Sequence, residues 1–245
     1  KLLVPFAAGG TTDLIARVVA DPLGRELGQP VIVENRPGAG GAVAGNTVVK
    51  SAPNSLEIFY AASPTMTISP HVLKAMAFDP LKDMTPLATI LSYANVLVIN
   101  QNQPFKTLPE LVAFGKANPG KLAYGSAGMG ASNHLSGELF ARRAGINMTH
   151  VPYKGNAPAM TDVIGGQIQM MFDIVGGAKG HIEGGKVRPL AVTSKERNPA
   201  LPQLPSMTEL GIRDYDVGGW YGLYGPLGMS AELSQKITAA TARAL

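Results

Sequence analysis

The chain has 245 residues, 45% of them hydrophobic and 16% charged, so it can form one large or two smaller packed domains. Its net charge of +4 comes from scattered basic residues, with no basic stripe or stacking aromatics suited to nucleic acid. The lack of cysteine excludes disulfides, thiolate chemistry and cysteine-based zinc sites, and no apolar run is as long as a membrane span.

Apolar strand-like runs alternate with helical patterns along the chain, which predicts an α/β fold with mostly parallel sheets. Strands are predicted at residues 2–4, 31–34, 56–61, 95–99, 121–124, 151–155, 170–173 and 189–193. Helices are predicted at 12–27 (bent or restarted at Pro22), around 46–50, at 107–117, from 132 to Gly145, from 156 onward and after the cap Ser230. Ser69 is expected to cap a further short helix.

Two segments are predicted to carry the chain between two lobes. The first is the polar, proline-containing run at 100–104, and the second is the glycine-rich run around Trp220, the only tryptophan. We therefore assign residues 1–99 and 220–245 to lobe I, and residues 100–219 to lobe II.

A small-residue turn separates the first predicted strand from the first helix. It contains two glycines, two threonines and Asp13, and no Lys or Arg lies between Leu2 and Ala16. Because the first N–H groups of a helix lack partners within the helix, such a turn can bind an anion through backbone donors. In a plain helix start, by contrast, Thr11 or Thr12 caps the helix and Asp13 turns toward backbone N–H groups. The turn is not a P-loop, because the lysine of that motif is absent.

The same layout occurs a second time, on the other side of the first crossover. The predicted strand at 121–124 leads through a glycine- and serine-containing turn at 125–132 into a helix that contains His134. Two such turns, one in each predicted lobe, could face each other across a cleft and hold one ligand.

Motifs along essentially the whole chain resemble those of the tripartite tricarboxylate transporter substrate-binding proteins, also called the Bug family of bacterial periplasmic receptors. The motifs that carry the resemblance are VPFAAGG at 4–10 with Asp13, GQPV at 28–31, ENRPGAGG at 34–41, FDPLKD at 78–83, NPGKL at 118–122, GSAGMG at 125–130, HVPYKG at 150–155, FD at 172–173 and LAVTS at 190–194.

The resemblance implies a type II periplasmic-binding-protein fold, with two α/β lobes joined by two crossing strands and a ligand cleft between them. It implies that the first turn forms one wall of the cleft, that Ser63 and Thr65 lie near the same mouth, and that the second turn forms the facing wall. Asp173 would meet a ligand amine or hydroxyl. The residues expected to bind the substrate are Phe6, Ala7, Ala8, Gly9, Gly10, Thr11, Thr12, Asp13, Ser63, Thr65, Ser126, Ala127, Gly128, Gly130, Ser132 and Asp173.

We therefore expect a periplasmic receptor that captures a small mono- or dicarboxylate, amino and aromatic acids included. It would close about a hinge and deliver the ligand to the subunits of a tripartite tricarboxylate-type membrane transporter. We expect a monomer without enzymatic activity, cofactor or metal, and without a nucleic-acid partner or direct membrane insertion. Both ends of the sequence look trimmed, so we expect a signal peptide to have been removed.

Two other functions are compatible with the sequence. A small α/β hydrolase would use Ser126 as its nucleophile, although Tyr124 stands where a nucleophile elbow requires glycine and His134 lies on the following helix. A carboxylate sensor would pass closure to a signalling partner instead of a transporter.

Several other polar residues and glycines have plainer interpretations. None of His71, His134, His150 and His181 has metal-ligand spacing to another histidine. Asp173 could equally pair with Lys154. The glycines at 38, 40 and 41 are read as close packing, because Val43 breaks the dinucleotide-binding fingerprint.

Overall fold

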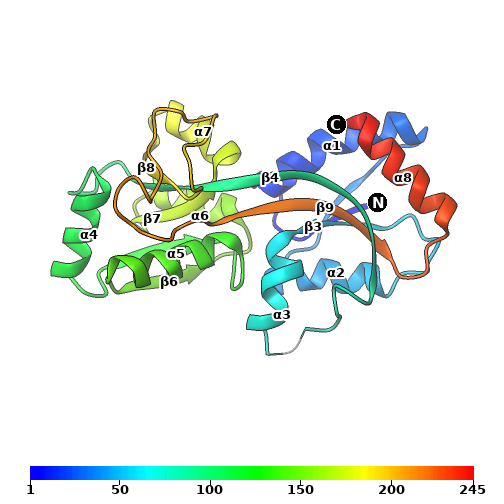
Figure 1. Cartoon of the computed structure of the whole chain (residues 1–245), viewed down its shortest axis with the longest axis horizontal. Coiled ribbons are helices and arrows are strands. Elements are labelled where there is room, and N and C mark those ends of the chain that lie inside the picture. The colour runs from blue at the N-terminus through cyan, green and yellow to red at the C-terminus, as the bar shows by residue number, and fades with distance from the viewer. Residues whose placement is uncertain (75) are drawn as a thin grey trace. The chain divides into compact units, whose positions relative to one another are not determined.

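The structure, a computed structural model, describes residues 1–74 and 76–245 and contains two compact α/β units (Figure 1). Unit 1 consists of Lys1–Ser92 and Gly219–Leu245, and unit 2 consists of Tyr93–Gly218. Two strands, β4 (Met84–Asn100) and β9 (Gly218–Pro226), each contain a point at which the chain passes from one unit into the other.

The observed division differs in position from the predicted lobes. Lobe II was predicted to begin at residue 100, whereas unit 2 begins at Tyr93, within β4. The polar run that suggested a crossover is instead a turn at the end of this strand, where the Asn100 side chain accepts a hydrogen bond from the Asn102 backbone N–H at 2.8 Å.

Unit 1 is built on a four-stranded sheet in the order β2-β1-β3-β9. β1 pairs in parallel with β2 and β3, and β3 pairs antiparallel with β9. The elements that complete this unit, besides the first part of β4, are β1 (Leu2–Val4), α1 (Thr11–Leu27), β2 (Val33–Asn35), α2 (Ala42–Val49), β3 (Ile58–Ala62), α3 (Ser69–Val72) and α8 (Ala231–Ala244).

Alternating side chains of the unit 1 sheet pack against helices on its two faces. Leu3 and Phe59 join the core that contains Val48 of α2, whereas Leu2 and Ile58 face α1 and α8. Because successive strand residues point to opposite faces, the short apolar strands β1 and β3 contribute to both layers.

Unit 2 contains a sheet in which β4 lies between β8 and β7, followed by β5 and β6. β5 pairs in parallel with β6 and β7, while β4 is antiparallel to β7 and β8. Its other elements are α4 (Leu108–Ala117), β5 (Leu122–Ser126), α5 (Ser132–Ala144), β6 (Met148–Pro152), α6 (Asn156–Ile164), β7 (Met170–Ile174), α7 (Val175–Glu183) and β8 (Val187–Val192).

The sheet of unit 2 is also covered on both faces. Leu97 and Phe172 belong to the core formed with α4 and α5, whereas Val96 and Met171 belong to the core formed with α6 and α7. The predicted α/β architecture is therefore present in each unit, but parallel pairing predominates only in unit 1, because β4 pairs antiparallel with both of its neighbours in unit 2.

Most predicted helix starts agree with the structure, but one does not. The helix predicted from residue 107 begins with a capping box of Thr107 and Glu110, and the Ser230 side chain caps α8 as predicted. α1 continues through Pro22. The prediction that Ser69 caps a short helix is wrong, because a π-helical turn over Pro64–Ile68 already precedes it and Ser69 is the first residue of α3.

The predicted ligand residues of each unit lie where parallel strands end. In unit 1, β1 leads into residues 6–13 and its neighbour β3 leads into Ser63. In unit 2, β5 leads into residues 126–132, and Asp173 lies near the end of its neighbour β7. In open α/β sheets the carboxyl ends of the strands form the usual binding edge.

None of the helices in the described part of the chain is long and apolar enough to span a membrane.

Candidate functional site

Residues 6–13, here called loop 1, connect β1 to α1 and present buried backbone donors. Gly10 is the N-cap of α1, and no side chain caps the helix there. Gly10, Thr11 and Thr12 are buried, yet no described residue accepts a hydrogen bond from their backbone N–H groups. Since buried amides are nearly always paired in folded proteins, these donors are suited to bind an anion at the helix N-terminus.

The Asp13 side chain fixes the conformation of loop 1 through hydrogen bonds. Its Oδ2 accepts a hydrogen bond from the Gly9 N–H at 2.9 Å, and its Oδ1 accepts one from Asn35 Nδ2 at 2.9 Å. Arg17 Nε donates to both carboxylate oxygens, at 3.1 and 3.0 Å. Burial alone would raise the pKa of Asp13, but the hydrogen bonds from Arg17, Gly9 and Asn35 outweigh it and lower this pKa. The carboxylate is therefore occupied by protein donors: the predicted backbone contact is confirmed at Gly9, while the other donors are the side chains of Asn35 and Arg17.

Asn35 is a second support of loop 1, and sequence reasoning did not single it out. Besides its bond to Asp13, its Nδ2 donates to the Phe6 carbonyl oxygen at 3.0 Å. Its Oδ1 accepts from Arg17 Nη2 at 3.3 Å. Asn35 ends β2, the strand parallel to β1, so the sheet brings it beside the loop. The contact of Asn35 with loop 1 depends on this strand pairing, which the sequence pattern did not predict.

The hydroxyl groups predicted for unit 1 have protein partners. The Oγ1 of Thr12 and the Tyr221 hydroxyl lie 2.8 Å apart, and Ser63 Oγ accepts the Trp220 N–H at 3.1 Å. Thr65 is fully buried, and its Oγ1 donates to the Gly40 carbonyl oxygen at 2.8 Å. Thr12 and Ser63 are thus both tied to β9.

Gly41 allows three parts of unit 1 to approach closely. A Cβ there would lie 2.3 Å from Thr65 Oγ1 and 2.9 Å from Pro5 Cβ, and the residue has φ of +95°. Both contacts are closer than real Cβ atoms allow, so glycine is required at this position. The prediction of close packing for this glycine run is confirmed at Gly41, and Thr65 is brought next to the start of loop 1.

Residues 126–132, here called loop 2, connect β5 to α5, and most of their amides are already used. Ala127 N–H donates to Asn133 Oδ1 at 3.0 Å, Gly128 N–H to Ser126 Oγ at 3.0 Å and Gly130 N–H to His134 Nδ1 at 3.2 Å. The second turn repeats the layout of the first, but these three amides are not free to bind a ligand. Among the described residues, no acceptor lies on the N–H groups of Met129, Ser132 and Asn133.

Two histidines that contact loop 2 have neighbouring, mutually tilted rings. The His134 and His150 ring centroids are 4.3 Å apart, and His150 stacks on Tyr124 at 5.0 Å. His150 Nε2 lies 2.6 Å from Ser126 Oγ. Burial lowers the pKa of both histidines, that of His150 to about 4 with a further contribution from His134, while Glu138 acts in the opposite direction. Spacing alone did not reveal this pair, because the two residues come from α5 and β6.

Asp173 connects to loop 2 through two asparagines. Its Oδ1 accepts hydrogen bonds from Asn156 Nδ2 and, at 2.8 Å, from the Ile174 N–H. Asn156 Oδ1 in turn accepts from Asn133 Nδ2 at 3.0 Å. The alternative that Asp173 pairs with Lys154 is not seen in the described residues, since Lys154 is exposed and Asp173 is buried. Burial raises the pKa of Asp173 to about 6, despite these hydrogen bonds.

Ser126 has the distance to a histidine that a nucleophile needs, but not the exposure. It is fully buried, and its Oγ also accepts the Gly128 N–H. A nucleophile must reach the reacting atom of a substrate, whereas this hydroxyl is directed into its own loop. Nor do the described residues contain a group of three or more His, Asp or Glu side chains placed to hold a metal.

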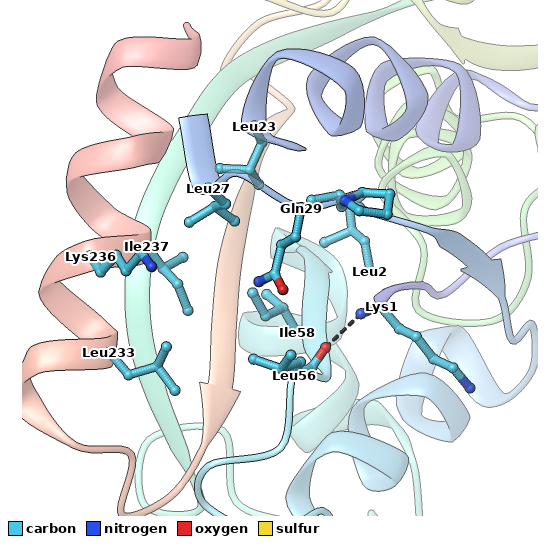
Figure 2. Close-up of a pocket in the computed structure, with 12 residues that line it drawn as sticks. Lys1, Leu2, Leu23, Leu27, Gln29, Leu56, Ile58, Leu233, Lys236 and Ile237 are labelled. Carbon is cyan, nitrogen blue, oxygen red and sulfur yellow. Dashed lines mark hydrogen bonds between the residues drawn. The ribbon is translucent and has the colours of Figure 1, made fainter. Parts of the chain in front are cut away.

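An apolar cavity lies elsewhere in unit 1, between α1, α8 and the ends of β1 and β3 (Figure 2). Its walls include Leu23, Leu27 and Ile237, and the terminal amino group of Lys1 donates to the Leu56 carbonyl oxygen beside it. None of the predicted site residues lines this cavity. Leu27 is the last residue of α1, about 24 Å along the helix from Thr11, so the cavity is separate from loop 1.

Comparison with known proteins agrees with this arrangement. The family model described as "Tripartite tricarboxylate transporter family receptor" matches residues 15–245. The periplasmic binding protein BugD is 34% identical with a TM-score of 0.95, over 99% of this chain and 81% of BugD. The Rhodopseudomonas palustris protein Rpa4515 with adipate is 33% identical with a TM-score of 0.95, over 98% of this chain and 81% of that one. MatC (Rpa3494) from Rhodopseudomonas palustris with bound malate is 32% identical with a TM-score of 0.95, over 99% of this chain and 83% of MatC.

The two α/β units and these neighbours define a periplasmic binding protein, which confirms the predicted fold class. More narrowly, the chain belongs to the tripartite tricarboxylate transporter receptor family, to which its motifs pointed. Because this is a family of solute-binding receptors, the chain is a receptor and not an enzyme, and the hydrolase hypothesis for Ser126 is wrong.

Proposed function

We propose that this receptor binds a small mono- or dicarboxylate through loop 1 and loop 2, with the substrate-binding residues predicted from the sequence. The observation that carries the proposal is that the N–H groups of three buried residues, Gly10, Thr11 and Thr12, have no acceptor among the described residues. They stand at the N-terminus of the 17-residue helix α1, whose dipole favours a negative charge. A carboxylate would pair these donors without any cationic side chain.

Loop 2 supports the proposal with a smaller set of donors. The N–H groups of Ser132 and Asn133 begin the 13-residue helix α5 and have no acceptor in the described part of the chain. Ala127, Gly128 and Gly130 would contribute the shape of the wall, since their own N–H groups are taken. Asp173 Oδ2 receives no hydrogen bond from the described residues, and it would accept one from a ligand hydroxyl or amine.

We infer that dicarboxylates of short chain are the first ligands to test. The related structures contain adipate in one case and malate in the other, and both are small dicarboxylates. A thermal-shift screen should include both, with the matched amides as uncharged controls. A ligand at about 100 times its Kd adds about 2.7 kcal/mol of stability, which raises the Tm by roughly 5–10 °C for a chain of this size. If no carboxylate of the screen shifts the Tm, the proposal fails.

The proposed mechanism is closure of the two units about β4 and β9 when one ligand is held by both loops. Support comes from the chain path, because these two strands are where the chain passes from unit to unit. Small-angle scattering would measure the radius of gyration with and without a ligand from the screen. Closure predicts a smaller radius with ligand, and an unchanged radius at saturation would contradict it.

Delivery of the ligand to the membrane subunits of a tripartite transporter is also part of the proposal. The family description supports it. The test is uptake of radiolabelled ligand into proteoliposomes that contain the membrane subunits, with and without this receptor. Uptake that needs the receptor supports a transport role, whereas binding without any receptor-dependent uptake would favour the sensor hypothesis.

A further inference from the structure

The two neighbouring histidines each contact a different part of loop 2. His134, in the first turn of α5, accepts the Gly130 N–H on Nδ1 at 3.2 Å. His150, in β6, lies with Nε2 at 2.6 Å from Ser126 Oγ, which itself accepts the Gly128 N–H. Gly128 and Gly130 have φ of +128° and +81°. The two glycines that give the loop its unusual backbone are therefore the ones that the histidines hold.

The contact between His134 and Gly130 requires an uncharged His134 ring. An imidazolium carries a proton on both nitrogens, so a charged His134 would point an N–H at the N–H of Gly130. A neutral His150 can accept the Ser126 hydroxyl on Nε2, whereas a charged His150 donates to Ser126 Oγ and turns that hydroxyl toward the Gly128 carbonyl oxygen, 3.2 Å away. The ring centroids of the two histidines are only 4.3 Å apart, so a charge on one ring also disfavours a charge on the other.

Few other ionisable groups face the two histidine rings. Tyr124 of β5 covers His150 and donates from its hydroxyl to Glu138 Oε1 at 2.6 Å. Glu138, one turn along α5 from His134, is the nearby acid and favours the charged form of both rings. Tyr215, whose hydroxyl donates to the Ser136 carbonyl oxygen at 2.7 Å, lies near Tyr124. Glu138 is thus the one group that opposes the neutral state among those acting on both rings.

We propose that His134 and His150 are positioning residues of loop 2, and that the carboxylate affinity of the receptor depends on both rings staying uncharged. This inference rests on the proposed function, in that loop 2 forms part of the carboxylate site. It predicts that carboxylate affinity depends on pH. The affinity stays constant while both rings are neutral, and it falls in acid when either ring gains a proton.

The first experiment compares side chains that can and cannot replace the imidazole hydrogen bond. In His134→Ala, Gly130 loses its acceptor, and we expect the affinity for adipate and malate at pH 7.5 to fall roughly tenfold or more. His134→Asn offers an amide oxygen near the Nδ1 position and should restore most of that loss. His150→Ala and His150→Gln form the equivalent pair for Ser126. His181→Gln, at the end of α7 and outside this histidine pair, is the matched control and should leave the affinity unchanged.

The pH profile separates positioning from a purely structural role. Wild-type affinity should be constant from about pH 7.5 and decrease as the pH approaches the value near 4 at which His150 gains its proton. The ligand also gains protons in this range, but this change is common to all variants. His134→Asn and His150→Gln cannot be charged, so their profiles should be flatter than that of wild type or His181→Gln. Identical profiles for all four proteins would overturn the inference.

A measurement without ligand decides the same point independently. Nitrogen chemical shifts of the two imidazoles should show neutral rings at pH 7.5, with Nδ1 of His134 unprotonated. On acidification the amide signals of Gly128 and Gly130 should move together with the ring signals. Rings that titrate without moving these amides, or a protonated Nδ1 of His134 at pH 7.5, would refute the inference. If wild type binds no carboxylate but the amides do follow the rings, the proposed function fails while the positioning role stands.

Discussion

In both loop 1 and loop 2, a parallel strand leads through a glycine turn into a helix. The two loops differ in the side chains that hold their backbone in place. Loop 1 is held by a charged group, because Asp13 accepts from Gly9, Asn35 and Arg17 while the helix amides stay free. Loop 2 is held by the neutral side chains of Ser126, Asn133 and His134, which take its own amides. The comparison teaches that turns of the same layout can leave different backbone amides free, depending on which side chains accept their hydrogen bonds.

The largest loss of stability is expected when the Asp13 carboxylate that holds loop 1 is removed. Asp13→Ala leaves the Gly9 N–H without its acceptor and removes one of the two acceptors of Asn35 Nδ2, and we expect a loss of roughly 2–4 kcal/mol in the free energy of unfolding. Carboxylate affinity should fall with it. Urea denaturation and calorimetric titration would measure both. Asp21→Ala, on the exposed face of the same helix, should change neither by more than about 0.5 kcal/mol.

A smaller loss is expected from the equivalent change in loop 2. Asn133→Ala removes the acceptor of the Ala127 and His134 N–H groups and the link to Asn156, for a loss of roughly 1–3 kcal/mol in unfolding free energy. Asn147→Ala, at an exposed position before β6, is the control. If Asn133→Ala destabilised the protein more than Asp13→Ala, it would contradict the prediction that the Asp13 hydrogen bonds contribute more to stability than those of Asn133.

The glycines of the two loops offer a third contrast. Gly9 has φ of +80° with no atom within 4 Å of a Cβ, whereas a Cβ at Gly128 would lie 3.3 Å from the Tyr153 carbonyl oxygen. Gly9→Ala should therefore cost only backbone strain, about 1 kcal/mol. Gly128→Val adds crowding at the ligand wall and should weaken carboxylate binding far more than it lowers stability. Equal losses of binding and stability in Gly128→Val would count against its place in the site.

Acid should loosen loop 2 before loop 1. The folded-state pKa values of His134 and His150 lie below the ordinary value of 6.5, so their stabilising contribution is complete above that pH and is lost as the pH falls toward about 4. The pKa of Asp13 is lowered from 3.8, so its contribution is lost only at still lower pH. Asp173 acts oppositely, since its raised pKa of about 6 favours folding in acid. Urea midpoints of Asp173→Asn between pH 7 and 4 should therefore fall more steeply than those of wild type. Parallel curves would contradict this assignment.

The smallest effect is expected at Arg17. Its side chain is 51% exposed, and water and salt screen exposed ion pairs so that they contribute little to stability. Arg17→Gln should lower the free energy of unfolding only slightly and make it less sensitive to salt, because Asn35 and Gly9 still donate to Asp13. A loss as large as that of Asp13→Ala would show that the charge pair, and not the set of hydrogen bonds, holds loop 1.

The sequence predicted what depends on local patterns. Capping residues marked the starts of α4 and α8, and the glycine turns marked both loops. It could not predict contacts that need strand neighbours, such as Asn35 reaching Phe6 or His150 reaching Ser126. The crossover was misplaced for the same reason: a polar run ends β4, while the change of unit lies inside a strand whose pattern is uninterrupted. Whether a turn amide is free is also a tertiary property, as loop 2 shows.

The chain carries a single indole, and its position on β9 makes it useful. Trp220 lies next to Gly219, where the chain re-enters unit 1, and its backbone is bonded to Ser63. Its fluorescence therefore comes from one known place beside the expected ligand residues. A change of emission on adding a ligand would report rearrangement of this strand without any attached dye.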